Sequence, residues 1–172
     1  IWIVNVGDIK PMEFPISFFL DYAWNPEKIG VEDLKKYTEQ WAAAQFGNEH
    51  AKEIADILSK YAKYNGRIKP ELLNEKTYSI FNYAEAQRVT DEYNDLLKRA
   101  EKVNAYLPEE FKDAYFQLVL HPVKACANLQ ELYTTVAVNK DAYQRKQANT
   151  NMLADRAKQL YKKDSLIRLE YH

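Results

Sequence analysis

The stretch Ile1–Pro15, IWIVNVGDIKPMEFP, differs in character from the rest of the chain. Its first six residues are mostly apolar and β-branched, which is typical of a strand buried on both faces of a parallel sheet. The following Gly7-Asp8 and Lys10-Pro11 predict a tight polar loop. A single strand leaves its backbone N–H and C=O groups unpaired, and no convincing second strand follows. We therefore expect Ile1–Val6 to be the last strand of an α/β domain that is otherwise missing.

The remaining sequence predicts long helices. Only four Gly and six Pro interrupt 172 residues, of which 47% are hydrophobic and 28% charged. Apolar residues recur at spacings of three and four, which is the pattern of a helix with one buried face. We expect helices over residues 13–23, 31–46, 48–64 and 82–106, a helix from 108 that is interrupted at 121–122 and resumes through 136, and a helix over 141–163 after a turn at 139–141. A short helix within 69–74 and a tail over 164–172 complete the prediction.

Three local signals refine these helices. The short link at Gly47 predicts that helices 31–46 and 48–64 form an antiparallel hairpin. His121-Pro122 predicts a kink or break, because Pro122 cannot donate a hydrogen bond to the Leu118 carbonyl. Two apolar stripes are expected to be buried: Leu34, Tyr37, Trp41 and Ala44 in one helix, and Ala86, Val89, Tyr93, Leu96, Ala100 and Val103 in another.

The predicted fold class is therefore all-α. We expect an antiparallel bundle of about five to seven helices with one short orphan strand at its N-terminus. In this interpretation residues 1–12 are the last strand and loop of a truncated (β/α)₈ barrel. Residues 13–172 form the helical bundle domain.

Charge and composition exclude several classes of partner. The formal net charge is −1, with acidic and basic residues interspersed, so no nucleic-acid or polybasic membrane surface is expected. No apolar run approaches the ~20 residues that a membrane-spanning helix needs. Cys126 is the single cysteine, which leaves no disulfide framework or zinc cluster, and we expect it to be a small buried hydrophobe.

Candidate site residues lie at the end of the predicted strand. In α/β barrels the active site is built at the carboxyl ends of the strands and in the loops that follow. Asn5, Asp8 and Lys10 occupy such positions and are candidates for a substrate pocket. The alternative, that residues 8–11 form an ordinary turn, is equally supported by the residues alone.

The rest of the chain offers no catalytic apparatus of its own. A glycosidase needs two carboxyl groups flanking the scissile bond, and no convincing pair occurs. Glu13 and Asp21 lie near the predicted strand, but helix-start and surface roles are favoured. His50, His121 and His172 are too dispersed for a metal site, and a Gly-rich phosphate loop is missing, so no metal or cofactor is expected.

Several motifs suggest a family. The run IWIVNVGDIKPMEFPISFFLDYAWNPE resembles the junction that follows the catalytic barrel in glycoside hydrolase family 115. The resemblance continues in the same order through TEQWAAAQFG (38–47), GRIKPELL (66–73), DAYFQLVLHPV (113–123) and a Tyr-Gln-Arg segment leading to Asn149. It spans nearly the whole chain, and NVGD-x-KP together with FQLV-x-HP is fairly specific.

The resemblance implies an enzyme that removes glucuronic acid, or its 4-O-methyl ether, from xylan side chains. Family members carry a (β/α)₈ barrel followed by a helical bundle, and they often form homodimers. Asn5 would lie in or beside the glucuronate pocket, Asp8 would support its loop, and Lys10 would assist or form a structural ion pair. The catalytic acid and base would lie upstream, so this piece would be inactive alone. Glucuronoxylan or its oligosaccharides would be the partner, in the periplasm or outside the cell.

Two other functions stay open. The chain could be a helical interaction or oligomerisation module that uses its Tyr and Trp residues as anchors for a protein partner. A carbohydrate-binding module is less favoured, because the aromatic residues are expected on buried helical stripes rather than on an exposed platform.

Overall fold

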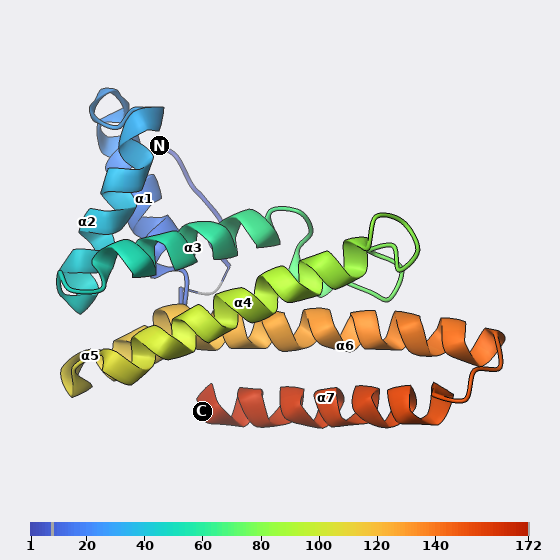
Figure 1. Cartoon of the computed structure of the whole chain (residues 1–172). Helices are drawn as coiled ribbons and strands as arrows, with labels where there is room; N and C mark the ends of the chain where they lie inside the picture. The colour runs from blue at the N-terminus through green and yellow to red at the C-terminus, as the bar shows by residue number, and fades with distance from the viewer. Residues whose placement is uncertain (8, 172) are drawn as a thin grey trace. The chain divides into compact units, whose positions relative to one another are not determined.

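The structure is a computed structural model that describes residues 1–7 and 9–171. Figure 1 shows its helices, and the described residues contain no β-strand. The chain divides into two compact units, which we describe separately. Unit 1 comprises residues 1–59 and 100–122, and unit 2 comprises residues 60–99 and 123–172.

The helical elements follow one another closely along the sequence. The α-helices are α1 (Glu13–Trp24), α2 (Leu34–Phe46), α3 (Ala51–Asn65), α4 (Glu85–Tyr106), α5 (Glu109–Tyr115), α6 (His121–Gln144) and α7 (Thr150–Tyr171). Short 3₁₀ turns are η1 (Pro26–Lys28), η2 (Val31–Asp33) and η3 (Pro70–Leu72), and the π-helical segment is η4 (Phe116–Leu120). The predicted all-α class is confirmed.

The predicted N-terminal strand is wrong for this structure. Residues 1–6 have no regular secondary structure and are exposed. The physical reason is that a strand exists only through hydrogen bonds to a neighbouring strand, and the described residues offer none. Trp2 nevertheless packs edge-on against Phe19 of α1, with ring centroids 5.0 Å apart. The division of the chain at residue 12 stays a prediction.

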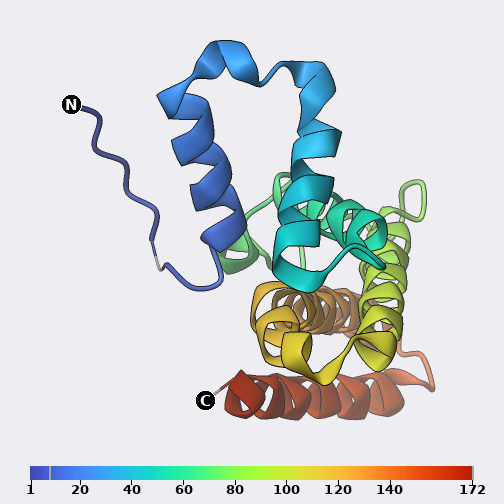
Figure 2. The same cartoon turned by 90° about the vertical axis from the view of Figure 1, so that its left-hand side faces the viewer.

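The core of unit 1 is built around aromatic residues. Figure 2 shows α1 and α2 as the two limbs of a hairpin joined by residues 25–33. Phe14 of α1 packs against Trp41 of α2 at 5.1 Å, and Phe46 packs edge-on against Tyr115 of α5 at 5.5 Å. The Tyr115 hydroxyl donates to the Ala100 carbonyl over 3.1 Å. Aromatic edges thus connect segments that are distant in sequence.

The buried stripe predicted for α2 is wrong by one position. Its buried residues are Thr38, Ala42 and Phe46, whereas Leu34 and Ala44 are exposed. Two aromatic members of the predicted stripe, Tyr37 and Trp41, are only half-buried because they face α1, a helix rich in phenylalanine. The predicted helical spacing of α2 was correct, but the face that is buried is rotated around the helix axis relative to the predicted one.

The predicted antiparallel hairpin of α2 and α3 is also not formed. Figures 1 and 2 show α2 crossing the start of α3 instead of running back alongside it. Gly47 ends α2 with φ +80° and ψ 168°, a conformation that redirects the chain before Ala51 starts the next helix. A four-residue link with this geometry favours a crossed pair.

Gly47→Ala is expected to lower the free energy of unfolding by about 1–3 kcal/mol, because a side chain at this φ and ψ is strained. Space is not the cause, since an added Cβ would lie 3.5 Å from the nearest Phe111 ring atom. Urea unfolding followed by circular dichroism measures the change. Gln45→Ala, at an exposed position of the same helix, is the control and should shift stability by less than about 0.5 kcal/mol. Equal effects of the two variants would contradict the prediction.

The buried stripe predicted for α4 is confirmed. All six of its members are buried: Ala86, Val89, Tyr93, Leu96, Ala100 and Val103. In unit 2, Val89 and Tyr93 pack with Ala127 of α6. Thr90 and Thr134 lie 2.9 Å apart between the same two helices, so a polar contact accompanies the apolar core.

The helix at Pro122 is not broken. Residues 116–120 widen into a π-helical turn, and the His121 N–H donates to the Phe116 carbonyl five residues earlier. A wider turn accommodates the missing N–H of Pro122 without interrupting the chain of helical residues. The predicted kink or break is replaced by this local change of helical pitch.

The boundary between the last two helices lies later than predicted. α6 continues through Asn139 to Gln144, and the turn occurs at Lys146, whose φ is +55°. Gln147 N–H then donates to the Ala142 carbonyl over 2.9 Å, which closes the end of α6. The tail predicted from residue 164 is helical as far as Tyr171, because Ile167 is buried and anchors it.

Candidate functional site

The predicted site residues lie in the exposed N-terminal segment. The Asn5 side-chain oxygen accepts a hydrogen bond from the Gly7 N–H over 2.9 Å, and Gly7 has a φ of +66°. This geometry is that of an Asx-type turn. Lys10 is exposed, and Asp8 lies outside the described residues. The structure gives no test of whether Asn5, Asp8 and Lys10 contact a substrate.

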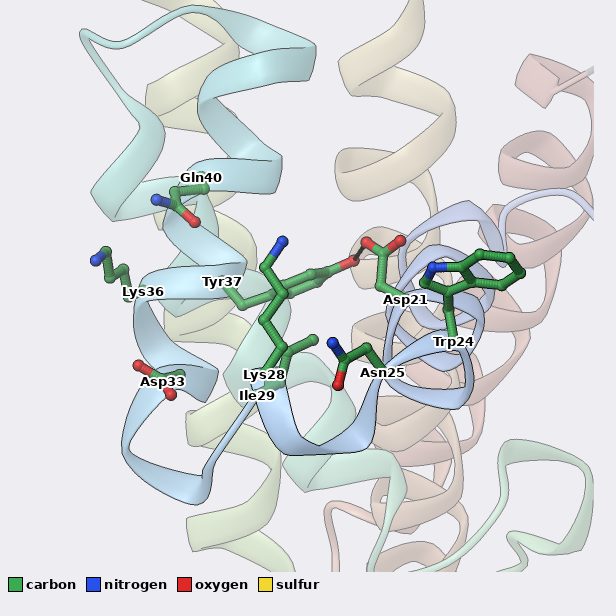
Figure 3. Close-up of a pocket in the computed structure, with 9 residues that line it drawn as sticks. All are labelled: Asp21, Trp24, Asn25, Lys28, Ile29, Asp33, Lys36, Tyr37 and Gln40. Atoms are coloured by element: carbon green, nitrogen blue, oxygen red, sulfur yellow. Dashed lines mark hydrogen bonds between the residues drawn. The ribbon is translucent and has the colours of Figure 1, made fainter.

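A pocket of about 520 Å³ lies elsewhere in unit 1. It opens where the end of α1, the linker through η1 and η2, and the first turns of α2 meet (Figure 3). Its volume falls in the range of roughly 300–1,000 Å³ that is usual for small-molecule sites. The lining is mixed, with one indole, polar amides and charges of both signs: Asp21, Trp24, Asn25, Lys28, Ile29, Asp33, Lys36, Tyr37 and Gln40.

The Tyr37–Asp21 pair joins the two helices at this pocket. The Tyr37 hydroxyl donates to Asp21 Oδ2 over 2.7 Å (Figure 3). Burial, the hydrogen bond to Asp21 and the negative charge of Asp21, in that order, raise the pKa of Tyr37 to about 12. The tyrosine therefore stays protonated at neutral pH and acts as a donor. Its ring also packs on Phe18 of α1 at 5.3 Å, so this pair is positioned by packing as well as by polarity.

The charged groups of the pocket are not all partnered within the protein. Asp33 Oδ2 accepts the Gly30 N–H over 3.0 Å at the start of η2. Lys28 and Lys36, by contrast, pair with no carboxylate in the part of the chain that the structure describes. Figure 3 shows Lys28 extending from the linker beside the Tyr37–Asp21 pair. The Lys28 ammonium group is thus available to a ligand beside this pair, whereas Figure 3 shows the Lys36 side chain directed away from it.

Trp24 and two amides complete the lining. The Trp24 side chain is 91% exposed at the end of α1, and Asn25 and Gln40 are exposed as well. An indole face with neighbouring amides provides an apolar surface and hydrogen bonds to a polar ligand. Sequence reasoning missed this pocket, because Trp24 and Asn25 follow the predicted helix 13–23 and were given no role. An aromatic-amide pair directly after a helix was the available signal.

Other candidate groups have structural roles. Glu13 Oε1 accepts a hydrogen bond from Gln117 Nε2 over 3.0 Å, which ties α1 to η4 within unit 1. Cys126 is half-buried, and burial raises the pKa of its thiol, so it stays protonated and is a poor nucleophile. Its sulfur lies 3.9 Å from the Tyr61 hydroxyl. Within the described residues, no group of three His, Cys, Asp or Glu side chains could hold a metal ion.

A comparison with known families now bears on this site. The sequence model that describes glycosyl hydrolase family 115 matches residues 1–72 of this chain. The resemblance predicted from the N-terminal motifs is thereby confirmed over residues 1–72, whereas its continuation through residues 113–149 stays a prediction.

The family 115 region contains both groups of candidate residues. Asn5 and Lys10 fall within it, and so does every residue that lines the pocket. No curated protein matches the chain. Across the described residues, no helix is long and apolar enough to cross a membrane.

The raised pKa of Tyr37 gives a prediction for alkaline pH. Its folded-state pKa of about 12 exceeds the ordinary value of 10.0, so between these values the folded chain holds a proton that the unfolded chain loses. The stability contribution of Tyr37 is therefore complete below pH 10 and falls as the pH rises toward 12. Tyr37→Phe should reduce this alkaline loss and remove one late-titrating phenolate from the absorbance titration. Tyr83→Phe, at an almost fully exposed tyrosine, is the control. Burial also raises the pKa of Tyr61, Tyr78 and Tyr93, so other late-titrating phenolates stay in every variant. An unchanged number of late-titrating phenolates in Tyr37→Phe would contradict the assignment.

Proposed function

We propose that this chain is the helical accessory part of a xylan α-glucuronidase, an enzyme that removes glucuronic acid or its 4-O-methyl ether from xylan. The observation that carries the proposal is the family 115 match over residues 1–72. In this proposal the catalytic acid and base belong to a (β/α)₈ barrel outside the chain, and the chain alone is inactive. A polysaccharide substrate places the enzyme in the periplasm or outside the cell.

The geometry of the N-terminal segment supports the proposal. Ile1, Trp2 and Ile3 are strongly exposed apolar residues, and a surface of this kind favours burial against another structure. Asn5 and Lys10 lie in and just after this apolar segment. Asn5 would then donate to the glucuronate, and Lys10 would pair with its carboxylate.

An activity comparison tests the proposal. The chain alone and a polypeptide that joins it to the barrel are assayed for glucuronic acid release from glucuronoxylan oligosaccharides. We expect release only from the joined polypeptide. In that polypeptide Asn5→Ala should lower kcat/KM by about 10- to 100-fold, which corresponds to one lost hydrogen bond to a charged group. The matched control is Asn151→Ala, an exposed change in α7. A joined polypeptide that releases no glucuronic acid would refute the proposed function.

One observation favours the alternative of a helical interaction module. Phe81 and Tyr83 are exposed in a loop where the Ser79 hydroxyl accepts hydrogen bonds from the N–H groups of Phe81 and Asn82. Tyr83 is 97% exposed and has a positive φ of 54°, an uncommon conformation for an aromatic residue. A joined polypeptide without glucuronidase activity, together with a dimer that Tyr83→Ser dissociates, would favour this alternative.

A further inference from the structure

We infer that the pocket between α1 and α2 binds an acidic saccharide, a sugar that carries a carboxylate. The choice of a saccharide rests on the proposed function, whereas the carboxylate is argued from the pocket itself. The residues that carry the argument are Trp24, Asn25 and Lys28, with the Tyr37–Asp21 pair as the fixed base of the site.

The charges of the pocket favour a ligand with a negative group. Asp21 and Asp33 already accept hydrogen bonds from the protein, from the Tyr37 hydroxyl and the Gly30 N–H. Lys28 has no carboxylate partner within the described residues, so its ammonium group is available beside the Tyr37–Asp21 pair. A ligand carboxylate beside Lys28 would form the charge-assisted hydrogen bond that the pocket lacks. The strength of this interaction should fall as the salt concentration rises.

The remaining lining fits sugar hydroxyls and a sugar ring. The Tyr37 hydroxyl uses only Oδ2 of Asp21, so Oδ1 is an acceptor for a hydroxyl of the ligand. Asn25 and Gln40 each provide a donor and an acceptor. The exposed indole of Trp24 at the rim provides an apolar face against which the C–H groups of a sugar ring can pack.

The rigidity of the base supports binding without a large rearrangement. The Tyr37 ring is held between Phe14 and Phe18 of α1, at centroid distances of 6.5 and 5.3 Å, and its hydroxyl is fixed by Asp21. A site whose polar groups are already positioned loses less conformational entropy when it binds. Lys28 is exposed, and a change of its side-chain rotamer is enough to reach a ligand carboxylate.

Calorimetric titration of the complete 172-residue chain tests this inference. The probes are xylotriose that carries a glucuronic acid branch, unsubstituted xylotriose and sodium acetate. We expect the acidic oligosaccharide to bind at least ~10-fold more tightly than xylotriose, as one charge-assisted hydrogen bond implies. Acetate at the same concentration should not displace it.

Three variants locate the binding. Lys28→Met should weaken binding of the acidic oligosaccharide about tenfold and leave xylotriose binding unchanged. Trp24→Ala should weaken both oligosaccharides. Lys35→Met is the matched control, since Lys35 is exposed on α2 but does not line the pocket. Circular dichroism checks that each variant is folded.

Several results would overturn the inference. These are equal binding of the acidic and neutral oligosaccharides, displacement by acetate, an equal effect of Lys28→Met and Lys35→Met, or no binding by the wild-type chain. The titration uses the 172-residue chain without the barrel. A negative titration would therefore reject the pocket as a saccharide site without bearing on the proposed α-glucuronidase activity. If the joined polypeptide releases glucuronic acid but no saccharide binds this pocket, the inference is rejected and the proposed function is retained.

Discussion

Replacement of Tyr115 by alanine is expected to lower the free energy of unfolding by about 3–5 kcal/mol. The side chain is completely buried, and its ring meets the Phe46 ring edge-on at 5.5 Å. Alanine would remove that aromatic contact, leave a cavity beside Phe46 and delete the hydrogen bond to the Ala100 carbonyl. Three separate losses fall on one residue, so the expected effect is large. Urea unfolding at several wavelengths of circular dichroism gives the value.

Two control variants separate these losses. Tyr115→Phe keeps the ring and removes only the hydroxyl, so it should cost about 0.5–1.5 kcal/mol. Tyr106→Ala removes an aromatic side chain that is mainly exposed, and should change stability by less than about 0.5 kcal/mol. A Tyr115→Ala effect no larger than that of Tyr106→Ala would show that the aromatic core of unit 1 is not formed as described.

Apolar periodicity predicted the helices well and their buried faces less well. In α4 the stripe was correct, because its apolar residues stand out against many exposed polar and charged ones, such as Gln87, Arg88 and Lys98. In α2 it was wrong, because Tyr37 and Trp41 count as apolar in a pattern although aromatic rings also suit half-buried positions. Neighbouring aromatic residues on α1 decided which face is buried, and the sequence of α2 alone does not contain that information.

Turns without glycine were the hardest boundaries to predict. Gly47 ends α2 as expected, and α3 ends at Asn65, beside the predicted stop at Asn65-Gly66. The turn after α6 uses Lys146 in a left-handed conformation, which lysine rarely adopts. Asn139 resembled a turn residue, but its amide instead donates to the Thr150 carbonyl over 2.6 Å. The Asn139 side chain therefore contacts the first residue of α7, whereas the sequence pattern had predicted that Asn139 ends its own helix, α6.

The site was only partly predictable, for a similar reason. Asn5 and Lys10 were found because a short motif places them after an apolar run, and their role stays a prediction. The pocket depends on Asp21 and Tyr37, which are 16 positions apart and meet only when α1 and α2 fold into a hairpin. A contact of this kind has no local sequence signal. Asp21 was therefore predicted to be a surface residue, and Tyr37 to be part of a core stripe.

The helix α7 depends on few buried side chains, and this gives the second large effect. Leu160 and Ile167 are its buried residues in the described part of the helix. The Leu160 carbonyl also accepts a hydrogen bond from the buried Asn128 amide over 3.1 Å. Lys124–Glu170 and Arg156–Glu131 ion pairs join α7 to α6 as well, but partly exposed ion pairs contribute little. The attachment of α7 is therefore mainly apolar.

Leu160→Ala is accordingly expected to lower the free energy of unfolding by about 2–5 kcal/mol, since it removes most of a fully buried leucine. Because the loss falls on the attachment of α7, the amides of this helix should lose hydrogen-exchange protection before those of α4. Leu166→Ala makes the same chemical change at a position of α7 that is 60% exposed, and it should cost less than about 0.5 kcal/mol. Equal effects at positions 160 and 166 would mean that α7 does not pack through Leu160. A loss of protection spread evenly over α4 and α7 would instead mean that unit 2 unfolds as one cooperative body, with α7 as an integral part.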